Sequence, residues 1–124
     1  MNPPVLTAAA RVALVVAVAA IAWLATTDRT YPAIEQVSDK LYHAAAFAVL
    51  AALADLSFPA GRFGLAKIGA LLGFGIAIEA VQYFLPHRQA SLADVLADGV
   101  GIAFYALCAP LVAKVATLRP RTRN

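Results

Sequence analysis

The sequence has few charged residues, and this shortage restricts the class of protein that it can encode. Only 14% of the 124 residues are charged, whereas a soluble domain usually carries about a quarter. Hydrophobic residues make up 62%, and the mean hydropathy is +0.77. So little polar surface cannot coat a water-soluble globule. We therefore expect an integral membrane protein that forms one compact domain over residues 1–124.

Cysteine and clustered basic residues are also scarce. Cys108 is the only cysteine, so an intramolecular disulfide is excluded, and its apolar neighbours favour a buried, inert thiol. The net charge of +3 is modest, and four of the ten basic residues lie after residue 113. This excess forms a tail rather than a basic stripe, so we expect no nucleic-acid partner. Because the sequence has no phosphate-binding glycine loop and no common zinc motif, we also expect no cofactor.

Long apolar segments account for most of the chain. Four of them cover residues 6–25, 41–58, 65–85 and 92–115. Each is close to the roughly 20 residues that a membrane-spanning helix needs. None alternates with a period of two, which argues against a β-barrel. The expected fold is an all-α membrane protein, a bundle of four transmembrane helices with short loops.

The basic residues divide unevenly between the two ends of these segments. Seven lie on the side of the two termini and of the second linker, and three lie on the other side: Arg29, Lys40 and Arg88. Cytoplasmic loops carry an excess of Lys and Arg. We therefore expect both termini in the cytoplasm and the linkers at residues 26–40 and 86–91 outside. Near the inner surface, Asp55 and Lys67 are expected to act as interface anchors.

Acidic residues gather at the expected outer ends of the last three helices. Each helix carries a polar stripe at helical spacing: Asp39 with His43, Glu79 with Gln82, and Asp94 with Asp98. Glu79 and Asp98 fall at hydrocarbon depth, where an ionised carboxylate costs about 2.5–3.5 kcal/mol on insertion scales. We expect both to face the interior of the bundle and to have polar partners there.

These residues define a candidate ligand-binding site or polar network across three helices. Its members are Asp39, Lys40, His43, Glu79, Gln82, Arg88, Ser91, Asp94 and Asp98. Arg88 and Lys40 are the candidates for holding phosphate. Ser91, with Asp94 three residues later, is a variant of the capping box that begins a helix. The histidine and the carboxylates are also metal-ligand types, but their spacing matches no familiar metal motif, so we expect no metal.

The order of these residues resembles the VanZ-like family of small bacterial membrane proteins. The pattern reads DKxxHxxxF over residues 39–47, ExxQ over 79–82 and PxRxxSxxDxxxDxxG over 86–101. The resemblance covers about residues 38–105 and departs at Asp98, where the family pattern more often has Asn. It implies a multi-pass protein of the bacterial cytoplasmic membrane that acts at the cell envelope. Founding members of the family are linked to resistance to the glycopeptide teicoplanin, but the resemblance supplies no reaction.

Two functions fit these observations. In the first, the outer polar site binds or processes the head group of a lipid or of a lipid-linked envelope precursor; binding and chemistry stay open, and no catalytic residue is assigned. In the second, the chain is a non-catalytic accessory subunit that packs beside a larger membrane complex. The small residues Gly69 and Gly73 would then permit close helix contact. A transporter or proton relay ranks last, because Asp55 is the only central candidate in the inner half.

Overall fold

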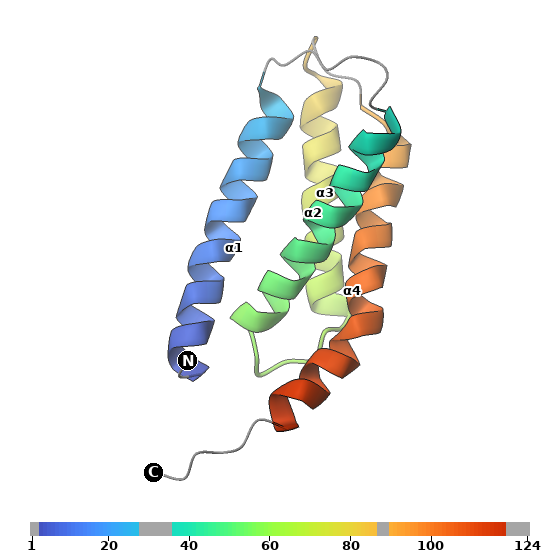
Figure 1. Cartoon of the computed structure of the whole chain (residues 1–124). Helices are drawn as coiled ribbons and strands as arrows, with labels where there is room; N and C mark the ends of the chain where they lie inside the picture. Colours follow the sequence, from blue (N-terminus) through green and yellow to red (C-terminus); the bar gives the residue numbers. More distant parts are fainter. Residues whose placement is uncertain (1–2, 28–35, 87–89, 119–124) are drawn as a thin grey trace.

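Four helices make up the structure, which is a computed structural model that describes residues 3–27, 36–86 and 90–118. They are α1 (Pro3–Thr26), α2 (Gln36–Ser57), α3 (Leu65–Tyr83) and α4 (Leu92–Leu118), and Figure 1 shows them side by side. No strand occurs in these described ranges. All four helices are long and apolar enough to cross a membrane. The predicted all-α bundle of four such helices is thus confirmed.

The ends of the helices differ from the predicted segments for identifiable reasons. α2 begins at Gln36 rather than near residue 41, and its first turn contains Asp39, whose negative charge suits a helix N-terminus. α3 ends at Tyr83 rather than residue 85. Its last turn tightens there, because the amides of Phe84 and Leu85 bond to the carbonyls three residues back. Pro86 follows, and a residue before proline disfavours helical geometry.

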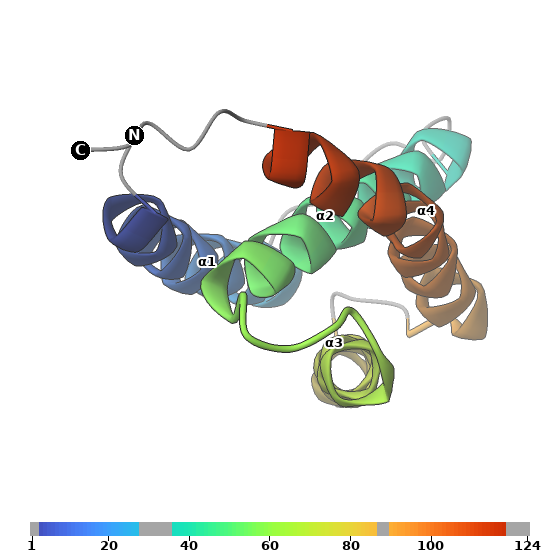
Figure 2. The ribbon, with the colours of Figure 1, turned by 90° about the horizontal axis from the view of Figure 1, so that it is seen from below.

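The second helix is the centre of the bundle. α2 packs against each of the other three helices, and Figure 2 shows it between α1 and α4, with α3 on one side. The core between them contains Phe47, Leu50 and Ala51 from α2, Leu71 from α3 and Ile102 from α4. The starts of α2 and α4 lie at one end of the bundle, which we call the cluster end (Figure 1). The start of α1 and the end of α4 lie at the opposite end.

Two glycines, Gly75 and Gly101, lie where the helices approach closely. A Cβ atom at Gly101 would collide with the backbone carbonyl of Ala44, so this glycine sets the distance between α4 and α2. A Cβ at Gly75 would lie 2.7 Å from Oδ2 of Asp98. At Gly69 and Gly73, in contrast, no atom lies within 4 Å, and both are exposed. The close contact expected of these two glycines is therefore not made within the described chain.

Candidate functional site

A group of charged side chains joins α2 to α4 at the cluster end. We call it the polar cluster: Asp39, Lys40 and His43 from α2, and Asp94 and Asp98 from α4. Asp39 and Asp94 lie in the first turns of their helices, and His43 and Asp98 follow one turn further in. Since α2 and α4 are adjacent and start at the same end, the two polar stripes face each other. Arg88, the expected phosphate ligand, lies outside the described residues.

His43 is held by the most deeply buried carboxylate of the site. Its Nδ1 lies 2.8 Å from Oδ1 of Asp98, whose residue is only 1% exposed. This bond gives the buried carboxylate a polar partner, as its depth requires. The other ring nitrogen, Nε2, lies 3.9 Å from Oδ2 of Asp39 and 3.9 Å from Oδ2 of Asp94. One nitrogen is therefore fixed by Asp98, and the other faces two carboxylates.

Lys40 forms an ion pair with Asp94 across the same interface. Its ammonium donates a hydrogen bond to Oδ1 of Asp94 and lies 3.9 Å from Oδ2 of Asp39. Asp94 is 5% exposed, so its charge is compensated inside the structure rather than by water. Lys40 is thus engaged with a carboxylate, which leaves it less available for a phosphate than the sequence suggested.

The start of α4 is capped by its own N-cap residue, Ser91, and by Glu79 of α3. The hydroxyl of Ser91 accepts a hydrogen bond of 3.2 Å from the amide of Ala93, which is the bond of an N-cap residue. In a capping box the residue three positions on would accept the Ser91 amide. Here Oε2 of Glu79, from α3, accepts it at 2.9 Å, and Asp94 is left to bind Lys40. Glu79, which is 8% exposed, thereby joins the end of α3 to the start of α4.

Gln82 lies near the polar cluster, but its hydrogen bond is to α1. Its side-chain amide donates a 3.0 Å hydrogen bond to the carbonyl of Ala25, in the last turn of α1. The expected stripe of Glu79 and Gln82 therefore joins α3 to α4 through one residue and to α1 through the other. In each of these two side chains, the Oε1 atom is buried and has no hydrogen-bond partner among the described residues.

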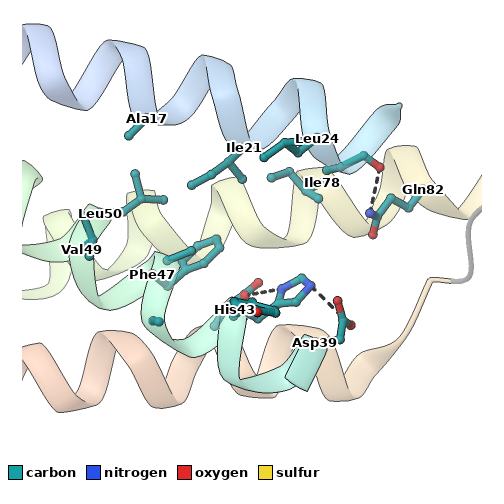
Figure 3. Close-up of a pocket in the computed structure, with 15 residues that line it drawn as sticks. Ala17, Ile21, Leu24, Asp39, His43, Phe47, Val49, Leu50, Ile78 and Gln82 are labelled. Atoms are coloured by element: carbon teal, nitrogen blue, oxygen red, sulfur yellow. Dashed lines mark hydrogen bonds and ion pairs between the residues drawn. The ribbon is translucent and has the colours of Figure 1, made fainter. Parts of the chain in front are cut away.

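A pocket of about 730 Å³ opens beside the polar cluster, as Figure 3 shows. This volume lies within the usual range of small-molecule sites, roughly 300–1,000 Å³. Its polar end is formed by Asp39, His43, Gln82 and Asp98. Its walls are apolar side chains of three helices: Ala17, Ile21 and Leu24 of α1, Phe47, Val49 and Leu50 of α2, and Ile78 of α3. Sequence reasoning missed the part played by α1, whose lining residues carry no polar signal.

A second set of polar contacts lies toward the opposite end. Asp55 accepts hydrogen bonds from Nζ of Lys67 at 2.8 Å and from the hydroxyl of Tyr105 at 2.7 Å. Arg11 donates from Nε to the carbonyl of Ser57 at 3.0 Å. These bonds connect all four helices in pairs, α2 with α3, α2 with α4 and α1 with α2. Asp55 and Lys67 therefore form structural contacts between helices, and their expected position at the membrane interface stays a prediction.

Three residues of the polar cluster have the arrangement of a partial metal site. Asp39, His43 and Asp94 each offer one ligand atom, and these atoms lie within 4.8 Å of one another. A structural zinc site has four protein ligands, and a catalytic one has three with an open position. The Oδ1 atom of Asp94 is already bound to Lys40, which adds a positive charge beside this position. The two carboxylates of this group would also attract a positively charged organic group.

Comparison of the chain with protein-family models, with curated proteins and with solved structures finds no significant match. The class of protein is therefore defined by the fold and the site themselves. It is an all-α protein of four helices, each able to cross a membrane by length and composition. Its distinguishing feature is a polar cluster at one end, in which Asp94 and Asp98 are buried, next to a pocket with apolar walls.

Proposed function

We propose that the protein is a multi-pass protein of the bacterial cytoplasmic membrane that binds a lipid or a lipid-linked envelope precursor. The observation that carries this proposal is the chemistry of the pocket, which changes from apolar walls along α1 and α2 to polar side chains at the cluster end. An amphiphile has the same two parts, because an apolar chain is followed by a polar head group. Its chain would lie against Ile21, Val49 and Leu50, and its head group would reach Asp39 and His43 (Figure 3).

The proposed orientation places both termini in the cytoplasm and the polar cluster toward the outer leaflet. It is supported by the excess of basic residues on the side of the termini. It is also consistent with the start of α1 and the end of α4 lying at the same end of the bundle (Figure 1). In this orientation the head group would come from the outer surface, where envelope precursors are used.

We also propose that the chain is of the VanZ-like type. Support comes from the motif residues, because those of α2 and α4 bond to one another although they are more than 50 positions apart. Lys40 pairs with Asp94, and His43 with Asp98. Similarly, Glu79 of the second motif bonds to Ser91 of the third. A set of motif residues that meet in space is expected of a shared site rather than of a coincidence of composition.

Blocking the pocket tests the binding of an amphiphile. Ala46 lines the pocket, so Ala46→Phe should fill part of it, whereas Ala103 on α4 is exposed and does not line it. The probe is a monoacylglycerol with a pyrene at the end of its chain, added to protein in phosphatidylcholine nanodiscs. Trp23, the only tryptophan, is next to the lining residue Leu24 and serves as the energy donor. We expect saturable energy transfer that Ala46→Phe abolishes and Ala103→Phe preserves; equal transfer in all three proteins would refute the proposal.

The accessory-subunit function is a second candidate, favoured by one specific observation. Gly69 and Gly73 form an exposed small-residue stripe on α3, and no atom of the described chain lies within 4 Å of where their side chains would begin. Such a stripe allows another helix to approach closely. Replacing both glycines with leucine should then remove a copurifying membrane protein. Under this function, the same change leaves the stability of the isolated chain unaltered.

A further inference from the structure

The polar end of the pocket contains a hydrogen-bond acceptor that the described residues do not satisfy. Oε1 of Gln82 is buried without a partner among them, in a residue that is 6% exposed. Buried polar atoms normally have partners, because an unpaired one costs free energy. Gln82 lines the pocket, and its amide nitrogen is turned to Ala25, so its oxygen is on the side away from α1 (Figure 3). A ligand that donates hydrogen bonds would supply the missing partner.

Among the residues that the structure describes, acidic side chains outnumber basic ones at the cluster end. Among the described residues, the carboxylates of Asp39, Glu79, Asp94 and Asp98 lie here with only one permanent cation, Lys40. The ammonium of Lys40 is already bound to Asp94. His43 adds at most one further positive charge, and Asp98 holds it. A positive charge from a ligand would therefore be stabilised beside the carboxylate of Asp39, which lines the pocket.

Asp39 is the side chain best placed to meet such a ligand. It lines the pocket, and its side chain is 54% exposed. Its ion-pair contacts with Lys40 and His43 are both 3.9 Å long, which is beyond hydrogen-bond distance. Its carboxylate can therefore accept hydrogen bonds from a head group without the loss of an existing short bond. The apolar walls of the pocket continue from this point along α2.

We propose that the ligand of this pocket is an amphiphile with an ammonium head group that carries N–H donors, held by the carboxylate of Asp39 and the amide oxygen of Gln82. This inference rests on the proposed function, because it assigns the chemistry of the ligand in the same pocket. It differs from the expectation from sequence, in which Lys40 and Arg88 would hold a phosphate. The donors of the ammonium satisfy an acceptor that is otherwise unpaired, and its charge offsets the excess of carboxylates.

Competition among three single-chain amphiphiles tests this inference in the nanodisc assay. Dodecylamine carries a charge and N–H donors, dodecyltrimethylammonium carries the charge alone, and dodecyl phosphate carries the opposite charge. All three have the same chain, so their differences report on the head group. We expect dodecylamine to displace the pyrene probe at a concentration at least about tenfold lower than dodecyl phosphate does, which corresponds to roughly 1.4 kcal/mol. Dodecyltrimethylammonium should fall between them.

Two carboxylate variants provide the matched comparison. Asp39→Asn removes one negative charge at the pocket and should reduce the preference for dodecylamine over dodecyl phosphate several-fold. Asp55→Asn removes the same charge at a residue that bonds to Lys67 and Tyr105 and does not line this pocket. It should leave the preference unchanged. Because Asp39 makes no short bond in the described structure, its variant is expected to fold, which a melting curve will check.

The outcomes separate this inference from the proposed function. Equal or stronger displacement by dodecyl phosphate would overturn the ammonium assignment and leave the binding of an amphiphile intact. Equal displacement by the two cations would overturn the role of the N–H donors. In a further outcome, dodecyl phosphate is preferred only after Mn²⁺ is added. That result would show that Asp39, His43 and Asp94 bind a metal ion, and it would overturn the inference. Failure of the probe itself to bind in a manner sensitive to Ala46→Phe would refute both proposals.

Discussion

Asp98 and His43, 55 residues apart in the sequence, are joined by a 2.8 Å contact between Oδ1 and Nδ1 that connects α4 to α2. Both groups are polar and lie among apolar helices, and Asp98 is 1% exposed. A buried carboxylate without this partner would be strongly unfavourable. The two residues therefore contribute to specifying which helices are neighbours as well as to the chemistry of the site.

The first prediction separates hydrogen bonding from charge in this pair. Asp98→Asn keeps an oxygen that can accept from Nδ1 of His43, so we expect a loss of stability below about 1.5 kcal/mol, the net value of one ordinary hydrogen bond. Asp98→Leu leaves the imidazole without its partner and should cost roughly 3–5 kcal/mol if His43 is charged. Reversible unfolding in mixed micelles measures both. Equal losses of stability in the two variants would show that the charge of the carboxylate, and not its hydrogen bond to His43, stabilises the protein.

A second prediction concerns the contact between α4 and α2 at Gly101. Gly101→Ala places a methyl group against the carbonyl of Ala44, and overpacking of this kind costs about 1–3 kcal/mol. Gly73→Ala is the matched control, because nothing lies within 4 Å of that position. Alanine there should be neutral or stabilise the helix by up to about 1 kcal/mol. Melting temperatures that fall by the same amount in both variants would contradict the close approach at Gly101.

The third prediction tests the double cap of α4. Ser91→Ala removes the hydroxyl that accepts from Ala93 and should cost about 1 kcal/mol. Glu79→Ala removes the acceptor of the Ser91 amide and should cost about 1–3 kcal/mol. Because Ser91 and Glu79 are in direct contact, the two losses should not add fully in the double variant. Hydrogen exchange of the Ser91 amide should become faster in Glu79→Ala alone, and an unchanged rate there would contradict the bond.

The fourth prediction is that Asp55 matters for stability, which its expected role as an interface anchor did not imply. Lys67 and Asp55 have side chains that are 11% and 21% exposed, so water replaces their interaction poorly. Asp55→Asn should therefore destabilise the protein measurably, by more than the roughly 1 kcal/mol upper range of exposed ion pairs. A double-mutant cycle with Lys67→Met isolates the pair. A coupling energy near zero would restore the interpretation of both residues as independent anchors.

The fifth prediction concerns the proposed orientation. In a Cys108→Ala background, Ala90→Cys and Ala60→Cys place a thiol in exposed loops at opposite ends of the bundle. A membrane-impermeant maleimide should label position 90 in intact cells, and position 60 only after the cells are permeabilised. Labelling with the reverse pattern would place the polar cluster on the cytoplasmic side and exclude an outer-leaflet ligand.

The helices were predictable because their signal is contained in single segments. A run of about 20 apolar residues identifies a possible membrane helix wherever the segment packs. The polar stripes were predictable for the same reason, since Asp39 and His43, or Asp94 and Asp98, are four residues apart on one helix. Adjacent helices that begin at the same end then bring these stripes together.

Contacts that depend on which faces meet were not predictable. From the sequence, Asp94 is the expected acceptor for the Ser91 amide. In the structure α3 lies close to the start of α4, and the Ser91 amide donates its hydrogen bond to Glu79 instead. The sequence also offers Gly69 and Gly73 as contact glycines, whereas Gly75, which no pattern in the sequence singles out, lies at an interface. Likewise, nothing in the apolar run of α1 indicates that Ile21 lines the pocket. Such pairings follow from the rotation of each helix about its axis, which a uniformly apolar segment does not specify.

The space beside Gly75 has an evolutionary consequence. The position of a Cβ on this residue would be 2.7 Å from Oδ2 of Asp98 and 3.3 Å from the ring of Phe47. A larger residue at position 75 can be accommodated only if the side chain at position 98 becomes smaller or turns away from α3, and a turn would break its bond to His43. A larger residue at position 75 should therefore be accompanied by compensating changes at positions 98 and 43.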